Sequence, residues 1–323
     1  MSALGGAVAA ASPLPARAQQ RNRMRRVGVL MNLSADDPKA RTFLDEFVRR
    51  LQEAGWANGQ NVEIHTRWSA GDPGQYQKYA AQLVAIEPDV VLAATTPAVR
   101  ALQKASPTVP IVFVAVIDPV GSNLIASMAR PGGSSTGFVI FEYSLAAKWL
   151  QLLKESAPSV TRAAVLRDAS QAAGIGQFAA IQTVAPIDLE LSAIDLRDAG
   201  EIERAVAAFA QSSNGGLIVT ASQFGANNPD LIATLAARHK LPAIDPFRYF
   251  VKTGGLMSYG SDQLNEYRGA AGYVDRILRG EKPAGLPVQA PTKYELVINL
   301  KTAKALNLDV PLAVLTRADG VIE

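Results

Sequence analysis

Residues Pro88–Gly133 read PDVVLAATTPAVRALQKASPTVPIVFVAVIDPVGSNLIASMARPGG and contain two apolar runs, each followed by a polar turn. The runs Val90–Ala94 and Ile111–Ile117 are too continuously apolar for a half-exposed hairpin. The residues between them have a helical pattern that suits a crossover connection, so we predict two buried parallel strands. Ligands of open parallel sheets bind beyond the carboxyl ends of the strands, which here carry Thr95, Thr96 and Asp118.

The rest of the first half continues this alternation of strands and helices. Strands are predicted at Arg26–Met31 and, as an alternating edge strand, at Asn61–Trp68. Helices are predicted at Arg41–Gly55 and Tyr76–Ile86, and the order of the elements is that of a doubly wound α/β fold.

The second half repeats the pattern of the first. Ala163–Asp168 resembles Val27–Asn32, and Leu241–Pro246, which ends in Asp-Pro, resembles the run that ends in Asp118-Pro119. Thr96-Pro97 and Asn228-Pro229 each predict a capping side chain before a proline at the first position of a helix. The fold class is therefore predicted to be α/β, with two similar doubly wound parallel-sheet lobes joined by several crossover segments.

The C-terminal part of the chain is longer than the second lobe requires, so it is expected to return to the first lobe and cross again. We expect a leader at 1–25. The first lobe is expected at 26–138 plus about 260–290, and the second at 139–259 plus about 291–323. Several crossings favour rigid-body closure about a hinge.

Composition excludes several classes of protein. A chain of 323 residues with 48% hydrophobic and 19% charged residues is typical of a soluble globular protein. The net charge of +3 and a single arginine cluster, at residues 21–26, do not indicate nucleic-acid binding. The absence of cysteine excludes disulfides, thiolate metal sites and a lipid-anchored N-terminal cysteine.

The first twenty residues, MSALGGAVAAASPLPARAQQ, predict an export leader that could be cleaved after Ala18. The basic segment that normally begins such a leader is missing, so the leader is expected to be truncated at that end. A tail without structure is the alternative.

Catalytic and cofactor motifs are missing. The first strand is followed by Asn32-Leu33-Ser34 with no glycine-rich phosphate loop, and no nucleophile elbow occurs in a strand-to-helix context. The two histidines, His65 and His239, do not form a metal or catalytic pattern. We therefore predict no catalytic residues, no metal and no cofactor.

Polar and aromatic residues instead gather at the predicted strand ends. Hydroxyls could bind a carboxylate, an aspartate could bind an ammonium group, and aromatic rings could enclose an apolar body. The predicted ligand-binding residues are Asn32, Ser34, Thr95, Thr96, Asp118, Tyr143, Asp168, Ser222, Asp245, Phe247, Tyr249 and Tyr259, with Phe141 and Glu142 as further candidates.

The set of motifs from Arg26 onward resembles the substrate-binding proteins of ABC transporters, of the type I periplasmic fold, in the group that includes tryptophan- and tyrosine-binding members. The motifs are Arg26–Leu30, Thr95–Ala98, Pro110–Phe113, Asp118–Gly121, Ala129–Gly133, Thr136–Phe138, Tyr259-Gly260 and Ala271–Gly280. The resemblance implies capture of a small organic solute, an amino acid or an aromatic or carboxylate-bearing molecule, between two closing lobes. It implies a monomer in the periplasm that meets the membrane only through an ABC permease and its ATPase.

Two other functions stay open at this point. An α/β enzyme could use Asp118 and Asp245 on a small polar substrate, because a fold does not fix a function. A solute sensor could present the ligand to a receptor.

Overall fold

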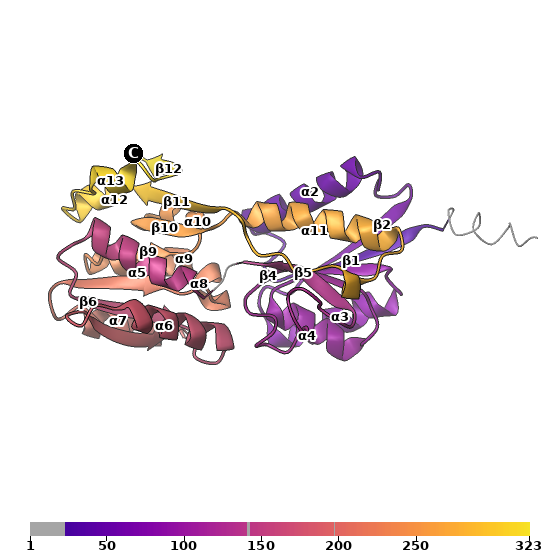
Figure 1. The fold of residues 1–323 in the computed structure, drawn as a ribbon, viewed down its shortest axis with the longest axis horizontal. Helices are drawn as coiled ribbons and strands as arrows, with labels where there is room; N and C mark the ends of the chain where they lie inside the picture. The colour runs from indigo at the N-terminus through magenta and orange to yellow at the C-terminus, as the bar shows by residue number, and fades with distance from the viewer. Residues whose placement is uncertain (1–22, 141–142, 197) are drawn as a thin grey trace, which may run out of the picture.

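The computed structural model describes residues 23–140, 143–196 and 198–323. The predicted leader cleavage site after Ala18 and the candidates Phe141 and Glu142 lie outside the described residues. Figure 1 shows two α/β lobes side by side, each built on its own sheet. We call the lobe with the N-terminal sheet lobe 1 and the other lobe 2.

Lobe 1 contains a five-stranded sheet in which every pairing is parallel. The order is β2 (Val62–Trp68), β1 (Arg25–Met31), β3 (Val90–Ala94), β4 (Ile111–Val116) and β5 (Ser135–Val139). Every residue of β3 is buried, as its apolar run predicts, and β2 is the edge strand that its alternation predicts.

Helices cover both faces of this sheet. One face packs against α2 (Pro38–Glu53) and α11 (Gln263–Leu278), and the other against α3 (Pro73–Ala85) and α4 (Thr96–Ala105). Helix α11 comes from the C-terminal part of the chain, yet it lies beside α2 in lobe 1 (Figure 1). A short 3-10 helix, Pro283–Gly285, follows it.

Lobe 2 contains a seven-stranded sheet. Its order is β12 (Gly320–Ile322), β11 (Tyr294–Asn299), β10 (Met257–Ser261), β9 (Ala243–Asp245), β8 (Gly215–Val219), β6 (Arg162–Arg167) and β7 (Glu190–Asp195). The pairs are parallel except β10 with β11, where the returning chain runs antiparallel.

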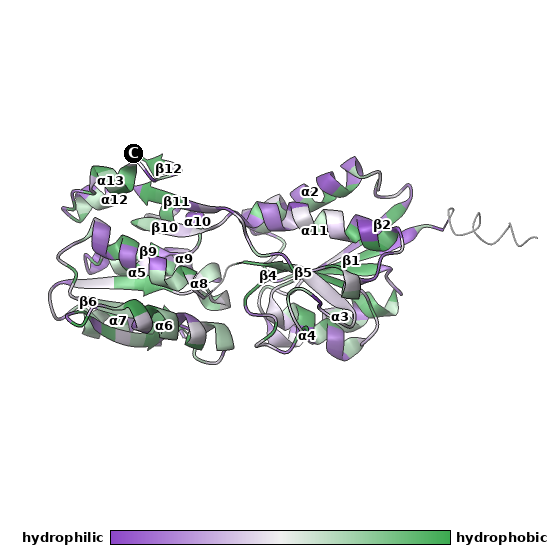
Figure 2. Ribbon diagram, viewed as in Figure 1, coloured by the Kyte–Doolittle hydropathy of each residue, from purple (hydrophilic) through white to green (hydrophobic). Residues whose placement is uncertain are grey.

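The helices of lobe 2 also form two layers. One core contains residues of α5 (Leu145–Ser156), α6 (Ala172–Val184), α12 (Leu300–Ala305) and α13 (Leu312–Leu315), and the other contains residues of α7 (Ala199–Phe209) and α9 (Pro229–Arg238). The short helices α8 (Gln223–Asn227) and α10 (Arg248–Lys252) follow β8 and β9. Hydrophobic residues concentrate in the strands and hydrophilic residues on the outer faces of α2 and α11 (Figure 2). No helix in the described part of the chain is long and apolar enough to cross a membrane.

Two features position the functional site. The chain passes between the lobes after β5, after β10 and before β11 (Figure 1). Both sheets share one strand pattern, because β2-β1-β3-β4-β5 in lobe 1 corresponds to β7-β6-β8-β9-β10 in lobe 2. Each sheet therefore has a topological switch point, between β1 and β3 and between β6 and β8, where doubly wound proteins bind ligands.

The predicted helix caps are wrong in both lobes. Thr96 is the first residue of α4, its N-cap is Thr95, and no side chain caps the helix. Asn228 is the N-cap of α9, but its side-chain amide donates a hydrogen bond to the carbonyl of Phe224 in the preceding helix instead. Pro229 is the first residue of α9, as predicted, whereas Pro97 is the second residue of α4.

Candidate functional site

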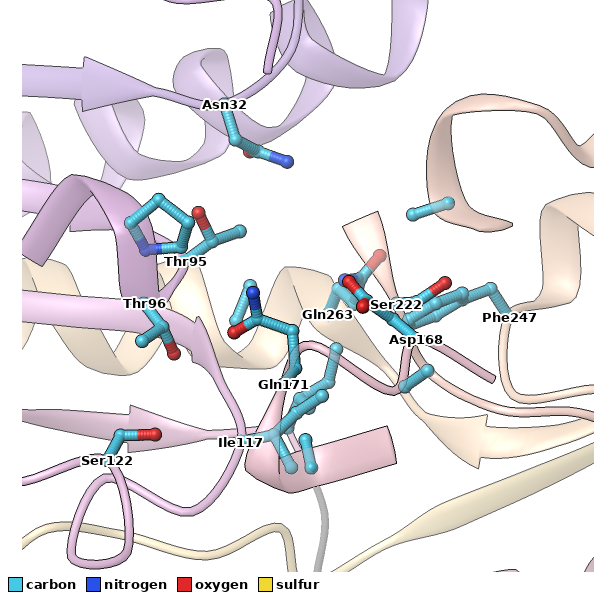
Figure 3. Close-up of a pocket in the computed structure, with 16 residues that line it drawn as sticks. Asn32, Thr95, Thr96, Ile117, Ser122, Asp168, Gln171, Ser222, Phe247 and Gln263 are labelled. Carbon is cyan, nitrogen blue, oxygen red and sulfur yellow. The ribbon is translucent and has the colours of Figure 1, made fainter. Parts of the chain in front are cut away.

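A cavity lies between the lobes, where the two switch points face each other. The space between its walls is about 740 Å³, a figure that includes the part open to solvent. Lobe 1 lines it with residues that follow β1, β3 and β4, and lobe 2 with residues that follow β6, β8 and β9. Figure 3 shows Asn32, Thr95 and Thr96 facing Asp168, Ser222 and Phe247 across the cavity.

Lobe 1 contributes uncharged hydrogen-bonding groups. Asn32 directly follows β1, while Thr95 and Thr96 form the turn from β3 into α4. Thr95 has φ 80° and ψ 159°, a conformation that is rare for a residue with a side chain and that clusters at ligand sites in proteins. The hydroxyl of Thr95 lies 3.4 Å from the hydroxyl of Tyr76, within hydrogen-bonding distance.

Lobe 2 contributes the charge and the aromatic ring. Asp168 follows β6, and its Oδ1 accepts hydrogen bonds from the backbone N–H and the hydroxyl of Ser170 at 2.9 and 2.6 Å. Ser222 caps α8 by accepting a hydrogen bond from the N–H of Gly225 at 3.0 Å. Phe247 is buried and stacks on Tyr249 with ring centroids 5.2 Å apart.

The charged group in the lining of the cavity is negative. Asp168 is the carboxylate there, and no lysine, arginine or histidine occurs among the described residues that line the cavity. A ligand ammonium group can pair with Asp168, whereas a ligand carboxylate would be held by hydroxyls, amides and backbone N–H groups. Ile117, Ile140 and Ala221 supply apolar surface.

Six of the twelve predicted ligand-binding residues line this cavity: Asn32, Thr95, Thr96, Asp168, Ser222 and Phe247. Asp118 and Tyr143 line a neighbouring cavity that shares Ile117 with the first. The hydroxyl of Tyr143 donates a hydrogen bond to Oδ2 of Asp118 at 2.7 Å, so this pair ties the segment before α5 to lobe 1. Burial and the Asp118 carboxylate together raise the pKa of Tyr143.

Asp245 lies outside the lining of the cavity. Its carboxylate is 1% exposed, and Oδ1 accepts the backbone N–H of Phe247 at 2.7 Å, which makes it a turn residue that orients Phe247. Burial raises the pKa of Asp245 to about 8, although the bond from Phe247 and the charge of Lys39 oppose the shift.

The other three predicted residues are also elsewhere. Ser34 is exposed in the loop before α2. Tyr249 packs behind Phe247, and burial raises its pKa well above the usual value. Tyr259 packs on Tyr294 in lobe 2, and its carbonyl accepts the Nε1–H of Trp149.

Sequence reasoning missed three polar residues that line the cavity: Ser122, Gln171 and Gln263. Gln171 and Gln263 lie at or next to the starts of α6 and α11, where a glutamine has no distinctive pattern. The described residues contain no group of three or more histidine, aspartate or glutamate side chains that could hold a metal ion.

Comparison with known proteins gives consistent relatives. A sequence model of the family described as ABC transporter substrate binding proteins matches residues 26–322. A tyrosine-binding protein of Clostridioides difficile (strain R20291) is 25% identical over 263 residues, 81% of this chain and 75% of the relative.

Two solved structures are similar over 93% of this chain and 100% of their own chains. A conserved domain protein from Vibrio cholerae is 27% identical with a TM-score of 0.85. An ABC domain in complex with L-Trp from Streptococcus pneumoniae is 26% identical with a TM-score of 0.82. Together with the two mostly parallel sheets, these likenesses confirm the predicted fold class.

Proposed function

Because the chain belongs to the family of ABC transporter substrate-binding proteins, we propose that it captures a zwitterionic amino acid with an apolar or aromatic side chain for an ABC importer. The resemblance predicted from the sequence is confirmed by this membership. The family and its structural relatives are solute-binding proteins, so the prediction that the chain is not an enzyme is confirmed as well.

The composition of the cavity carries the proposal. A zwitterion has one ammonium and one carboxylate, and the cavity offers one aspartate opposite a set of neutral donors. Asp168 would bind the ammonium group, and the hydroxyls of Thr95 and Thr96, with the first turn of α4, would bind the carboxylate. Phe247, with Ile117 and Ile140, would pack against the side chain of the ligand.

Two relatives support the choice of ligand. One carries the name tyrosine-binding protein, and the other was solved with L-Trp. Both ligands are zwitterions with an aromatic side chain, which is the chemistry that the cavity of this chain suits.

Binding from both lobes would favour the closed state over the open state, because only the closed state makes both sets of contacts. The permease and ATPase of an importer are the proposed partners, and the periplasm is the proposed location. The stretch rich in small residues that ends in Ala16-Arg17-Ala18 supports export. Mass spectrometry of the mature protein recovered from a periplasmic fraction tests both the location and the cleavage site.

Calorimetry and thermal unfolding with matched ligands test the binding function. L-Trp, L-Tyr, L-Phe and L-Leu are compared with tryptamine, which lacks the carboxylate, and with indole-3-propionate, which lacks the ammonium group. A ligand at 100 times its Kd should stabilise the protein by about 2.7 kcal/mol. If neither the zwitterions nor their analogues bind, the proposal is wrong.

A substitution in lobe 2 tests the role of the carboxylate. Asp168→Asn should weaken amino acid binding by about 10- to 100-fold, because a charge-assisted hydrogen bond is lost, and should leave indole-3-propionate unaffected. Asp188→Asn changes an exposed aspartate outside the cavity and serves as the matched control. Equal losses for both ligands contradict the assignment of Asp168.

A further inference from the structure

Lys39 of lobe 1 reaches lobe 2 beside the cavity. It lies in the first turn of α2, and its backbone N–H donates to the side chain of the N-cap residue Asp37 at 2.8 Å. The N-terminal turn of α2 is thereby capped within lobe 1, while the long side chain of Lys39 extends to the other lobe.

Two groups of lobe 2 receive the ammonium group. Nζ lies 3.4 Å from the carbonyl oxygen of Ala226 in α8, to which it donates a hydrogen bond. It also lies 4.3 Å from the centre of the Tyr249 ring, a cation–π distance. No local sequence pattern predicts this contact, because 187 positions separate Lys39 from Ala226.

Asp37, which is also in lobe 1, pairs with the charge of Lys39. Oδ2 of Asp37 is 3.6 Å from Nζ, and the two side chains are only 27% and 21% exposed. Contacts that are partly removed from water are screened less than those of fully exposed charges. Lys39 therefore makes a stronger contact between the lobes than an exposed lysine would.

The two lobe 2 groups belong to the wall of the cavity. Ala226 lines the cavity itself, and Tyr249 stacks on Phe247, which lines it. Lys39 is not part of the lining. It contacts lining residues from outside the cavity, so it can hold the lobes together without contacting a ligand in the cavity.

We propose that Lys39 is a closure latch, a positioning residue that holds lobe 2 over the cavity by binding Ala226 and the face of Tyr249 from lobe 1. The proposal rests on the proposed function in one respect, that the cavity closes on a ligand. The latch strengthens the binding of every ligand by the same factor, because it favours the closed state and does not distinguish among ligands.

A distance measurement without ligand tests the latch directly. The chain has no cysteine, so spin labels can be attached through Lys104→Cys in α4 and Glu203→Cys in α7, both at exposed positions on different lobes. Pulsed electron resonance then reports the separation of the lobes. Lys39→Met should shift the distances to longer values, and Lys39→Arg, which keeps a cation, should restore the native distribution.

Lys78→Met is the matched control. Lys78 also lies over a tyrosine ring, 5.8 Å from the centre of Tyr79, but this contact stays within α3. It should leave the distance distribution unchanged. If Lys39→Met also leaves it unchanged, the latch proposal is wrong.

Binding measurements provide the second arm. Lys39→Met should weaken L-Trp, L-Tyr and L-Phe binding by the same factor, about tenfold, the effect of losing a partly desolvated cation–π contact. If Lys39→Met changed the ratios among the Kd values of these ligands, Lys39 would be distinguishing among them, and this result would overturn the proposal. If none of the three binds to the native protein, the proposed function fails, while the ligand-free distances still decide the latch.

Discussion

Replacing Glu266 by glutamine should abolish a loss of stability that the native protein suffers as the pH rises. Glu266 lies in α11 and is 5% exposed. Its Oε2 accepts the backbone N–H of Ala115 at 2.8 Å, and its Oε1 lies 3.4 Å from the hydroxyl of Ser261. The Ser261 hydroxyl faces two acceptors, Oε1 of Glu266 and the carbonyl oxygen of Ile140, which lies at 2.7 Å.

Burial of Glu266 favours its neutral form. Burial raises its pKa from 4.5 to about 8; the hydrogen bonds from Ala115 and Ser261 oppose the shift, and the nearby charge of Asp262 adds to it. The folded state therefore holds this proton more tightly than the unfolded state. Since protonation favours folding, the free energy of unfolding falls as the pH rises from about 4.5 to about 8.

The expected size of this loss follows from the pKa shift. Each unit of pKa corresponds to about 1.36 kcal/mol, so the loss between pH 4.5 and pH 7 is on the order of 3 kcal/mol. Glutamine has an oxygen for the Ala115 N–H and an amide group that can donate to Ser261, and it does not titrate. The Glu266→Gln protein should match the native protein near pH 4.5 and be more stable at pH 7 to 8.

Urea unfolding of both proteins at pH 5, 6, 7 and 8 measures the effect. The difference between the two proteins isolates Glu266, because the other buried carboxyl with a raised pKa, Asp245, is present in both. The free-energy difference should grow with pH in favour of the variant. A difference that is the same at all four pH values would refute the raised pKa of Glu266.

Two further predictions concern packing and hydrogen bonding away from the cavity. Gly260→Ala should cost about 3 kcal/mol or more of unfolding free energy, because its Cβ would collide with the carbonyl oxygen of Pro246. Gly285→Ala meets nothing within 4 Å and should cost less than about 1 kcal/mol, and equal urea midpoints for the two variants would contradict this reasoning. Trp149→Phe removes the 2.7 Å hydrogen bond to the Tyr259 carbonyl and should lower stability in thermal unfolding by about 1–3 kcal/mol; no change in Tm would show that this bond contributes nothing.

The pattern of apolar residues along the sequence was sufficient to predict most of the fold. Val90–Ala94 and Ile111–Val116 became buried central strands because continuous apolar runs can be satisfied only between two helical layers. The alternating run at Val62–Trp68 became the edge strand. The antiparallel pairing of β11 was not predicted, because strand direction depends on how the chain returns and not on its composition.

The site was harder to predict, because the position of a residue after a strand does not say where its side chain turns. Asp168 follows β6 and Asp245 is the last residue of β9, but only Asp168 lines the cavity. Asp245 turns inward to the N–H of Phe247. Gln263 and Lys39 escaped prediction because their roles depend on the approach of one lobe to the other, which no local pattern encodes.

The repeated Asp-Pro sequences have a structural role in their turns and do not place two equivalent aspartates in the cavity. The carboxylates of Asp118 and Asp245 bind backbone N–H groups of their own turns, those of Gly121 and Phe247, so the repeat maintains the scaffold at the ends of β4 and β9.

The chemistry of the cavity arises instead where equivalent positions differ. Asn32 follows β1 and Asp168 follows the corresponding strand β6, and both line the cavity, but only the second is charged. Thr96 follows β3 at the position that Ala221 occupies after β8, so at this position only lobe 1 has a hydroxyl. A zwitterion in the proposed cavity would therefore have one orientation, with its ammonium group toward lobe 2 and its carboxylate toward lobe 1, although the two lobes share one fold.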